Sequence, residues 1–241
     1  MGRLIRRVRA APAGPHETRG SSVLRPTVFG VTDGLVANVC LIMGVAGASS
    51  EAAHIVLAGI AGLVAGSFSM AMGEYISVRS QHELLDYQIE LERTQLRQTP
   101  DEERAILVEI YRSRGLSGIG AGRVVDRLLA DPKQALDTFV RDEIGLSAAT
   151  MGSPITAALG SLLAFALGAS VPLMPYVVVS GVMALVVSIA CTLGALFLVG
   201  LGVSRLTHRR PLWSGLRQAA LGLVAAGVTY GIGMLLGTAV H

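Results

Sequence analysis

Five long stretches of the chain are almost entirely apolar. They cover residues 26–48, 52–78, 154–175, 176–202 and 218–240. Each has about 20 residues or more, the length that an α-helix needs to cross the hydrocarbon core of a bilayer. A helix also satisfies all its backbone hydrogen bonds internally, as a lipid-embedded segment must. The pattern therefore predicts an all-α membrane protein with five transmembrane helices.

A polar stretch, residues 79–150, separates the second apolar stretch from the third. Nothing in the sequence breaks the second helix at its polar end, so we expect one continuous helix to about Arg97. Thr99 followed by Pro100 is typical of a helix start, because proline fits the first helical turn, and it predicts a helix through Arg114. Residues 79–150 are therefore expected to form a helical insert.

The rest of the insert alternates helix breakers with short helical segments. Gly115 suits the position just past a helix end, and the glycine-rich residues 118–122 are expected to form a loop. A short helix is expected over residues 123–130. An Asp-Pro pair at 131–132 predicts one more helix, which ends near Glu143. The predicted organisation is a tail (1–25), two spans (26–78), the insert (79–150) and three spans (151–241).

All twenty Lys and Arg residues lie outside the five apolar stretches. Six lie in residues 1–25, ten in 79–150 and four in 203–217, whereas the segments around 49–51 and 171–175 have none. By the positive-inside rule, the N-terminus, the insert and the 203–217 segment are cytoplasmic. Five spans then place the C-terminus outside the cell or in a lumen. A bacterial plasma membrane and a vacuole-like organelle both fit this orientation.

Composition narrows the class of protein further. Residues 1–25 are rich in Arg, Pro and Gly, and are expected to be a disordered basic tail near anionic lipid headgroups. Acidic residues offset the basic residues of the insert, which indicates a solvated domain and not a nucleic-acid-binding surface. Cys40 and Cys191 both fall in apolar stretches, as small buried hydrophobes do. Nothing resembles a nucleophile–base pair or a phosphate-binding loop, so we do not expect an enzyme.

Two acidic residues interrupt the apolar stretches, Asp33 in the first and Glu74 in the second. A carboxylate costs roughly 2.5–3.5 kcal/mol at a bilayer centre, so it marks a functional site by default. Met70 lies four residues before Glu74 and shares its helix face. Counting about 1.5 Å per residue from Arg25 and Arg79 puts Asp33 and Met70 at one depth, with Glu74 nearer the cytoplasm.

Oxygen and sulfur ligands together favour Fe²⁺ or a similar transition metal over Mg²⁺ or Ca²⁺. We therefore hypothesise a cation path lined by Asp33, Met70 and Glu74, with Met72 beside it. Protonation of Asp33 or Glu74 would release the ion. Two plainer interpretations stay open: the methionines as core packing, and Glu74 as an interfacial acid paired with an Arg.

Small residues recur at four-residue spacing in the first two apolar stretches, in the motifs Gly30-x-x-x-Gly34 and Gly62-x-x-x-Gly66. Such motifs let two helices approach closely. Packing within the chain explains them, and a homodimer interface is a further use. The motifs do not select the helix that would form it.

Two segments resemble signatures of the vacuolar iron transporter family. Residues 29–36 (FGVTDGLV) resemble its first-helix signature, and residues 69–78 (SMAMGEYISV) with Gln81 closely resemble its second-helix signature. Residues 157–173 are similar to its third span. The resemblance runs in the same order over roughly residues 25–240.

This resemblance implies a five-span homodimeric carrier of Fe²⁺, often also of Mn²⁺, that moves the ion out of the cytoplasm in exchange for protons. The family's path residues match Asp33, Met70 and Glu74 here. The metal is the substrate, and no cofactor is implied. The alternative from another class is a membrane-anchored scaffold or regulator whose insert binds a partner, with the membrane acids paired to hidden bases.

The resemblance also implies that acidic residues of the insert gather metal on the cytoplasmic side. The candidates are Asp86, Glu90, Glu102, Asp142 and Glu143. The Asp-x-Glu that many members carry after the signature Gln is missing, however. Asp86 and Glu90 share a face at i, i+4, yet Arg93 and Arg97 follow, which is typical of a salt-bridged solvent face. Both interpretations stay open.

Overall fold

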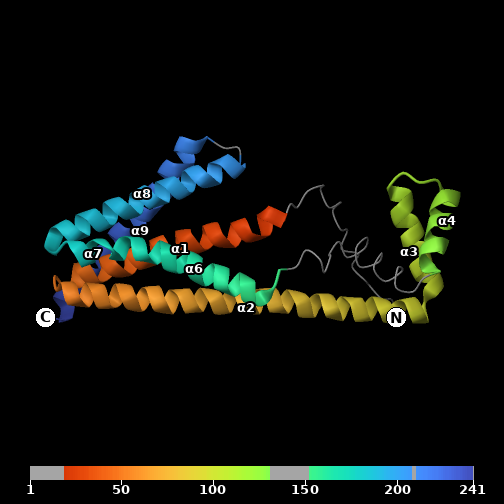
Figure 1. The fold of residues 1–241 in the computed structure, drawn as a ribbon, viewed down its shortest axis with the longest axis horizontal. Coiled ribbons are helices and arrows are strands. Elements are labelled where there is room, and N and C mark those ends of the chain that lie inside the picture. Colours follow the sequence, from red (N-terminus) through yellow and green to blue (C-terminus); the bar gives the residue numbers. More distant parts are fainter. Residues whose placement is uncertain (1–18, 131–151, 208–209, 241) are drawn as a thin grey trace. The chain divides into compact units, whose positions relative to one another are not determined.

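The computed structural model describes residues 19–130, 152–207 and 210–240 (Figure 1). Every regular element within these ranges is a helix, which confirms the all-α class. By backbone contacts the chain divides into two compact units. The insert unit contains the described residues within 77–152, and the membrane unit contains those within 20–76 and 153–241. Residues 79–98 of the insert therefore belong to the same continuous helix as the second apolar stretch, but to a different unit.

Five helices of the described ranges are long and apolar enough to cross a membrane. They are α1 (Arg19–Ala48), α2 (Ala52–Gln98), α6 (Pro154–Leu173), α8 (Gly181–Thr207) and α9 (Pro211–Val240). This confirms the five predicted spans of a multi-pass membrane protein. It also confirms that α2 runs on as one helix past the apolar stretch, to within a residue of the expected end.

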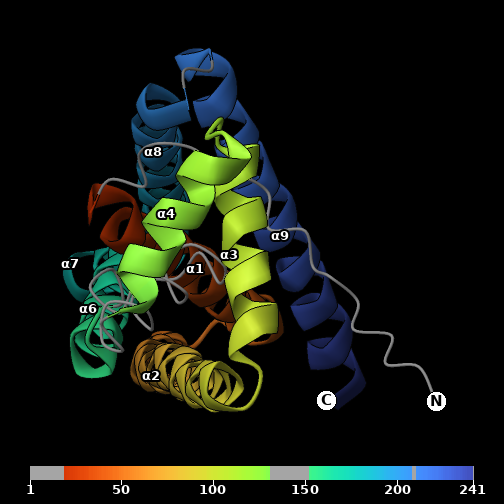
Figure 2. The ribbon, with the colours of Figure 1, turned by 90° about the vertical axis from the view of Figure 1, so that its right-hand side faces the viewer.

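Helix α1 contributes a larger number of buried residues to the membrane unit than any other described helix, among them Leu35, Val39, Ile42 and Met43. Its neighbours approach through small residues. On the α6 side, a Cβ on Gly34 would stand 2.9 Å from the Ala169 nitrogen; on the α9 side, a Cβ on Gly47 would stand 3.0 Å from the Met234 nitrogen. Backbones this close leave no room for a side chain. Helices α8 and α9 lie side by side (Figures 1 and 2).

Two of the spans begin earlier than expected. Helix α1 begins at Arg19, so the last residues of the predicted tail are helical. Helix α9 begins at Pro211 and not at Gln218, because proline fits a first helical turn without needing its missing N–H. Arg217 therefore lies inside the fifth span, close to its beginning, whereas the sequence pattern predicted that it lies in the segment before that span.

The connection between the third and fourth spans also differs. Helix α6 contains Pro172, α7 (Pro175–Val178) is a separate short helix, and α8 begins at Gly181 instead of Tyr176. The chain turns at Gly181, whose φ of +67° is costly for a residue with a Cβ. Ser188 Oγ of α8 donates a 2.6 Å hydrogen bond to the Pro172 carbonyl and ties the two spans together.

In the insert unit, α3 (Pro100–Ser113) and α4 (Gly118–Leu129) lie side by side (Figure 2). The start of α3 at Pro100 and the turn at Gly115, with φ +98°, are as expected. The loop expected over residues 118–122 is instead the first turn of α4. Ser117 Oγ accepts from the Gly120 N–H at 3.2 Å and caps that turn.

The α3–α4 hairpin has its own small core, in which Leu107 and Val125 are fully buried. Arg104 of α3 donates to both carboxylate oxygens of Asp126 of α4, at 2.6 and 3.1 Å. These charged hydrogen bonds lower the pKa of Asp126. The further helix expected up to Glu143 lies outside the described residues.

Candidate functional site

Helices α1 and α2 run antiparallel, and three contacts set their register. A Cβ on Gly30 would stand 3.5 Å from Met70 Cε, and one on Gly62 would stand 2.7 Å from Asn38 Oδ1. Further along, a Cβ on Gly59 would stand 3.2 Å from Ile42 Cδ1. Each step along α1 is matched by a step back along α2. The register therefore fixes which turn of α2 lies beside each turn of α1.

Asp33 follows Gly30 by three residues, which is a rise of about 4.5 Å along α1. Since Met70 touches the Gly30 position, Asp33 lies within about a turn of the Met70 level. Both side chains are half-buried. Counting residues predicted a common depth for Asp33 and Met70, and in the structure their levels along α1 and α2 are close. The role of either residue stays a prediction.

Glu74 lies one turn beyond Met70 on α2, toward the basic end of the apolar stretch, and is also half-buried. Neither Glu74 nor Asp33 forms an ion pair in the part of the chain that the structure describes. The described residues hold no group of three or more His, Cys, Asp or Glu side chains that would bind a metal. A single copy of the site therefore offers few ligands at any one depth.

Small residues also bring α6 against this part of α1 and α2. A Cβ on Gly168 would stand 3.0 Å from the Leu35 nitrogen of α1, and one on Gly66 of α2 would overlap the Phe165 ring. The four glycines of the two sequence motifs thus all pack inside one chain. Their spacing is accounted for by the α1–α2–α6 junction alone.

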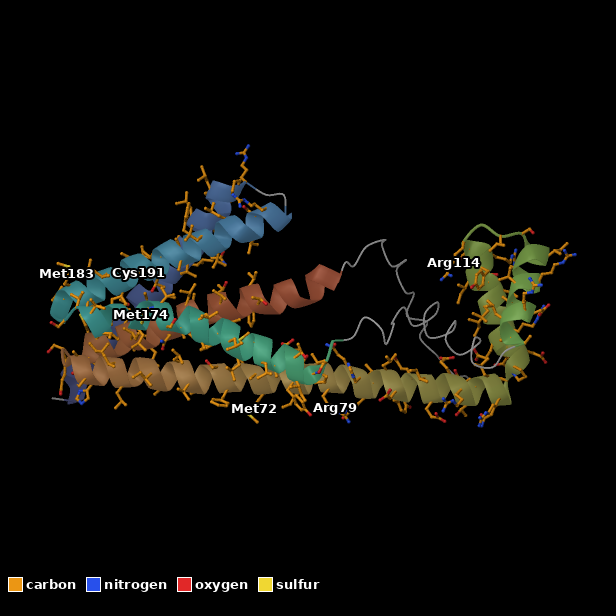
Figure 3. All side chains as sticks on the ribbon, in the orientation of Figure 1. Met72, Arg79, Arg114, Met174, Met183 and Cys191 are labelled. Carbon is orange, nitrogen blue, oxygen red and sulfur yellow. The ribbon has the colours of Figure 1, made fainter. Side chains whose placement is uncertain are left out.

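Met72 lies apart from this junction. Successive helical residues are about 100° apart, so Met72 and Met70 point to different sides of α2. The Met72 side chain is 65% exposed and lines an apolar hollow with Tyr75 of α2 and Leu159 of α6. Figure 3 marks its place on α2. Its predicted contribution to the path is not tested by this arrangement.

Three of the candidate metal-gathering acids of the insert are described, namely Asp86, Glu90 and Glu102, and all three are solvent-exposed. Glu90 Oε2 pairs with Arg93 Nη1 at 2.7 Å, as the salt-bridged interpretation expects. Asp86 is exposed on the same helix, and Glu102 lies in the first turn of α3, where an acid stabilises the helix dipole. Asp142 and Glu143 lie outside the described residues. Metal gathering by these acids stays a prediction.

Comparison with known proteins agrees with the signature segments. The model of the VIT family matches residues 24–234. The chain belongs to the VIT family. "Vacuolar iron transporter 1" of Oryza sativa subsp. japonica is 34% identical over 218 residues, covering 90% of this chain and 86% of the relative. "Vacuolar iron transporter 1" of Arabidopsis thaliana is 31% identical over 216 residues, covering 89% and 86%. The "Vacuolar iron transporter" of Toxoplasma gondii is 27% identical over 231 residues, covering 92% and 76%.

In this VIT family member, the sequence reasoning missed two buried polar side chains at the three-helix junction. Asn38 of α1 is 1% exposed and Ser161 of α6 is fully buried, and neither Asn38 Oδ1 nor Ser161 Oγ has a hydrogen-bond partner among the described residues. A signal for Asn38 was available, since an amide within an apolar stretch, five residues after Asp33, is costly in a membrane. Serine is common in such stretches and gave no comparable signal.

Proposed function

We propose that this chain carries a divalent metal ion, Fe²⁺ and often also Mn²⁺, out of the cytoplasm along α1 and α2. The observation that carries the proposal is the contact of Met70 with α1 within about a turn of Asp33. It brings a thioether within about a turn of a carboxylate, in two stretches that are otherwise mostly apolar. The names of the curated relatives, which are vacuolar iron transporters, support iron as the cargo.

The order of the side chains along α2 gives a mechanism. Glu74, one turn closer to the basic end, attracts the ion first, and Asp33 with Met70 binds it deeper in the membrane. A carboxylate and a thioether together suit a borderline transition metal better than Mg²⁺. Protonation of either carboxylate would release the ion, so exchange for protons follows from the same residues.

The orientation proposed with this mechanism has the N-terminus and the insert in the cytoplasm and the C-terminus on the far side. The distribution of Lys and Arg supports it. Arg217 lies near the start of α9, at the cytoplasmic end in this orientation. The exposed acids of the insert would raise the local cation concentration on the cytoplasmic side of the membrane. A surface pair such as Glu90–Arg93 is worth at most about 1 kcal/mol, so it does not prevent that role.

A homodimer is part of the proposal. One face of α2 carries small exposed residues at every fourth position, namely Ala61, Ala65, Ser69 and Gly73. Nothing lies within 4 Å of a Cβ placed on Gly73. Small-residue faces support close helix pairing in membranes. A single copy offers few ligands near Met70, and a second copy would double their number.

Uptake of ⁵⁵Fe²⁺ by proteoliposomes, at two internal pH values, tests the proposal. Asp33→Ala is expected to lower the rate by tenfold or more, the effect of about 1.4 kcal/mol, and acidic internal pH is expected to raise wild-type uptake. Met183→Leu is the matched control, because Met183 is 61% exposed and lies in the first turn of α8 (Figure 3). Unchanged uptake by Asp33→Ala would overturn the path. No uptake by the wild-type protein would overturn transport and leave the scaffold alternative.

A further inference from the structure

Asn38 is a buried amide of which only one end is hydrogen-bonded. Its Nδ2 donates a 2.6 Å hydrogen bond to the Ala169 carbonyl of α6. Its Oδ1 is buried and has no partner in the part of the chain that the structure describes. A buried polar atom left without a hydrogen bond costs about 1–3 kcal/mol. Packing alone would not require that cost, because an apolar side chain would fill the same space.

The orientation of the Asn38 amide follows from chemistry. The Ala169 carbonyl oxygen can only accept, so the atom beside it must be the donating Nδ2. The carbonyl oxygen Oδ1 is therefore held toward α2. There it meets Gly62, on which a Cβ would stand only 2.7 Å away. The absence of a side chain at Gly62 is what gives Oδ1 its place between α1 and α2.

Asn38 lies one level beyond the proposed site, on the face of α1 that also carries Gly30 and Gly34 and contacts α2 and α6. Asn38 follows Asp33 by five residues, about 7.5 Å further along α1 toward the far side of the membrane. Beyond it, Tyr176 packs on the cluster of Val39, Ile42 and Met43, and its buried hydroxyl has no partner among the described residues. Two unpartnered polar atoms thus lie beyond the Asp33 level, among apolar side chains.

We propose that Asn38 Oδ1 is an oxygen ligand for the metal ion on the outward side of Asp33 and Met70; this rests on the proposed function. A neutral amide oxygen binds Mn²⁺ or Fe²⁺ without adding charge, so it holds the ion less tightly than a carboxylate does. Conduction needs sites that are favourable enough to enter and weak enough to leave. Separation of α2 from α1 at Gly62 would open Oδ1 to the ion and its waters.

Two substitutions separate a ligand from a structural clamp. Asn38→Leu and Asn38→Asp both remove the Nδ2–H that bonds Ala169, but only Asp keeps an oxygen facing Gly62. In proteoliposomes that take up Mn²⁺ or Fe²⁺, we expect Asn38→Leu to lower the uptake rate about tenfold. Asn38→Asp keeps an oxygen ligand but releases the ion more slowly, so we expect it to lower the rate less than Asn38→Leu does. We also expect Asn38→Leu to bind Mn²⁺ in detergent within about threefold of wild-type affinity, since Asp33 and Met70 remain.

Ser188→Ala is the matched control for a lost interhelical bond. It removes another 2.6 Å hydrogen bond to an α6 carbonyl, one made from α8 and not from α1, and is expected to leave uptake unchanged. Equal loss in Asn38→Leu and Asn38→Asp would show that Asn38 only clamps helices, and would overturn the ligand role. Unchanged uptake in Asn38→Leu would overturn it too. If wild-type protein takes up no metal, the proposed function itself fails.

A second pair keeps the test valid if Asn38→Leu does not fold. Asn38→Thr and Asn38→Val have the same shape, and only Thr carries an oxygen. Faster uptake by Asn38→Thr than by Asn38→Val, at equal amounts of monodisperse protein, supports the ligand role. Equal rates overturn it.

Discussion

The terminal methyl of Met70 on α2 lies 3.5 Å from the position that a Cβ on Gly30 of α1 would occupy. The same position is 2.8 Å from the Ala164 Cβ and 3.4 Å from the Phe165 nitrogen of α6. Three spans therefore meet at one glycine. Because Asp33 follows on the next turn of α1, the space at Gly30 also decides how Met70 lies relative to that carboxylate.

A methyl group at Gly30 is expected to disturb this junction. Gly30→Ala puts a Cβ 2.8 Å from that of Ala164, so a helix must shift. Overpacking of this kind costs about 1–3 kcal/mol, only partly offset by the roughly 1 kcal/mol that alanine gains over glycine in a helix. We expect a lower melting temperature in detergent and slower Fe²⁺ uptake.

Gly73→Ala is the control for the Gly30 substitution. It lies on α2 and gains the same helix propensity, but nothing lies within 4 Å of its new Cβ. We expect its melting temperature in monomeric form to equal or exceed that of the wild type. A Gly30→Ala protein as stable as Gly73→Ala in monomeric form would contradict the tight junction.

Removal of the Met70 sulfur is expected to change ion preference more than stability. Met70→Leu nearly conserves volume, and such core swaps usually cost less than about 1.5 kcal/mol. A thioether favours softer ions, so uptake of Fe²⁺ should fall more than uptake of Mn²⁺. The ratio of the two rates in one set of proteoliposomes measures this. An unchanged ratio would assign Met70 to packing, the interpretation that the sequence left open.

The α3–α4 hairpin is expected to loosen in acid through Asp126. Arg104 lowers the pKa of Asp126 in the folded hairpin. The pair therefore stabilises the hairpin above the ordinary aspartate pKa of about 3.9, and that contribution is lost as pH falls through the lowered folded value. Hydrogen-exchange protection of α4 in the full chain, compared between about pH 6 and about pH 3, measures the loss.

Asp126→Asn should lower α4 protection at the higher pH and reduce its dependence on pH. Glu109→Gln is the control, because Glu109 pairs with Arg112 of its own helix at 3.3 Å and does not join α3 to α4. A wild-type pH response that Asp126→Asn reproduces in full would show that other carboxylates cause it.

The fold was predictable where hydrophobicity and local chemistry decide it. Apolar length alone predicted five spans, and Thr99-Pro100 and Gly115 predicted both ends of α3. The failures occurred where packing overrides local preference. Residues 118–122 are rich in glycine, yet they are helical because Ser117 caps the turn and Ala121 is fully buried against the rest of the hairpin.

For the candidate site, the relative levels of Asp33 and Met70 could be predicted from the sequence, but the contacts of Asn38 could not. Counting residues from Arg25 and Arg79 brought Asp33 and Met70 to nearly the same level, because the rise per residue of a helix is constant. The unpartnered Oδ1 of Asn38 depends on the register of α1 against α2 and α6. A single sequence does not contain that register, since it arises from many small contacts such as those of Gly30, Gly62 and Gly66.

The turn before α8 gives a prediction that depends on backbone conformation alone. Gly181 has φ +67°, and nothing lies within 4 Å of a Cβ built on it. Gly194, in the middle of the same helix, has equally open space and an ordinary helical backbone. Gly181→Ala is therefore expected to cost about 1–2 kcal/mol through its left-handed conformation, whereas Gly194→Ala should gain helix propensity. Thermal unfolding of the full chain in one detergent should place Gly181→Ala about 2–8 °C below the wild type. Equal melting temperatures for the two variants would contradict a strained turn at Gly181.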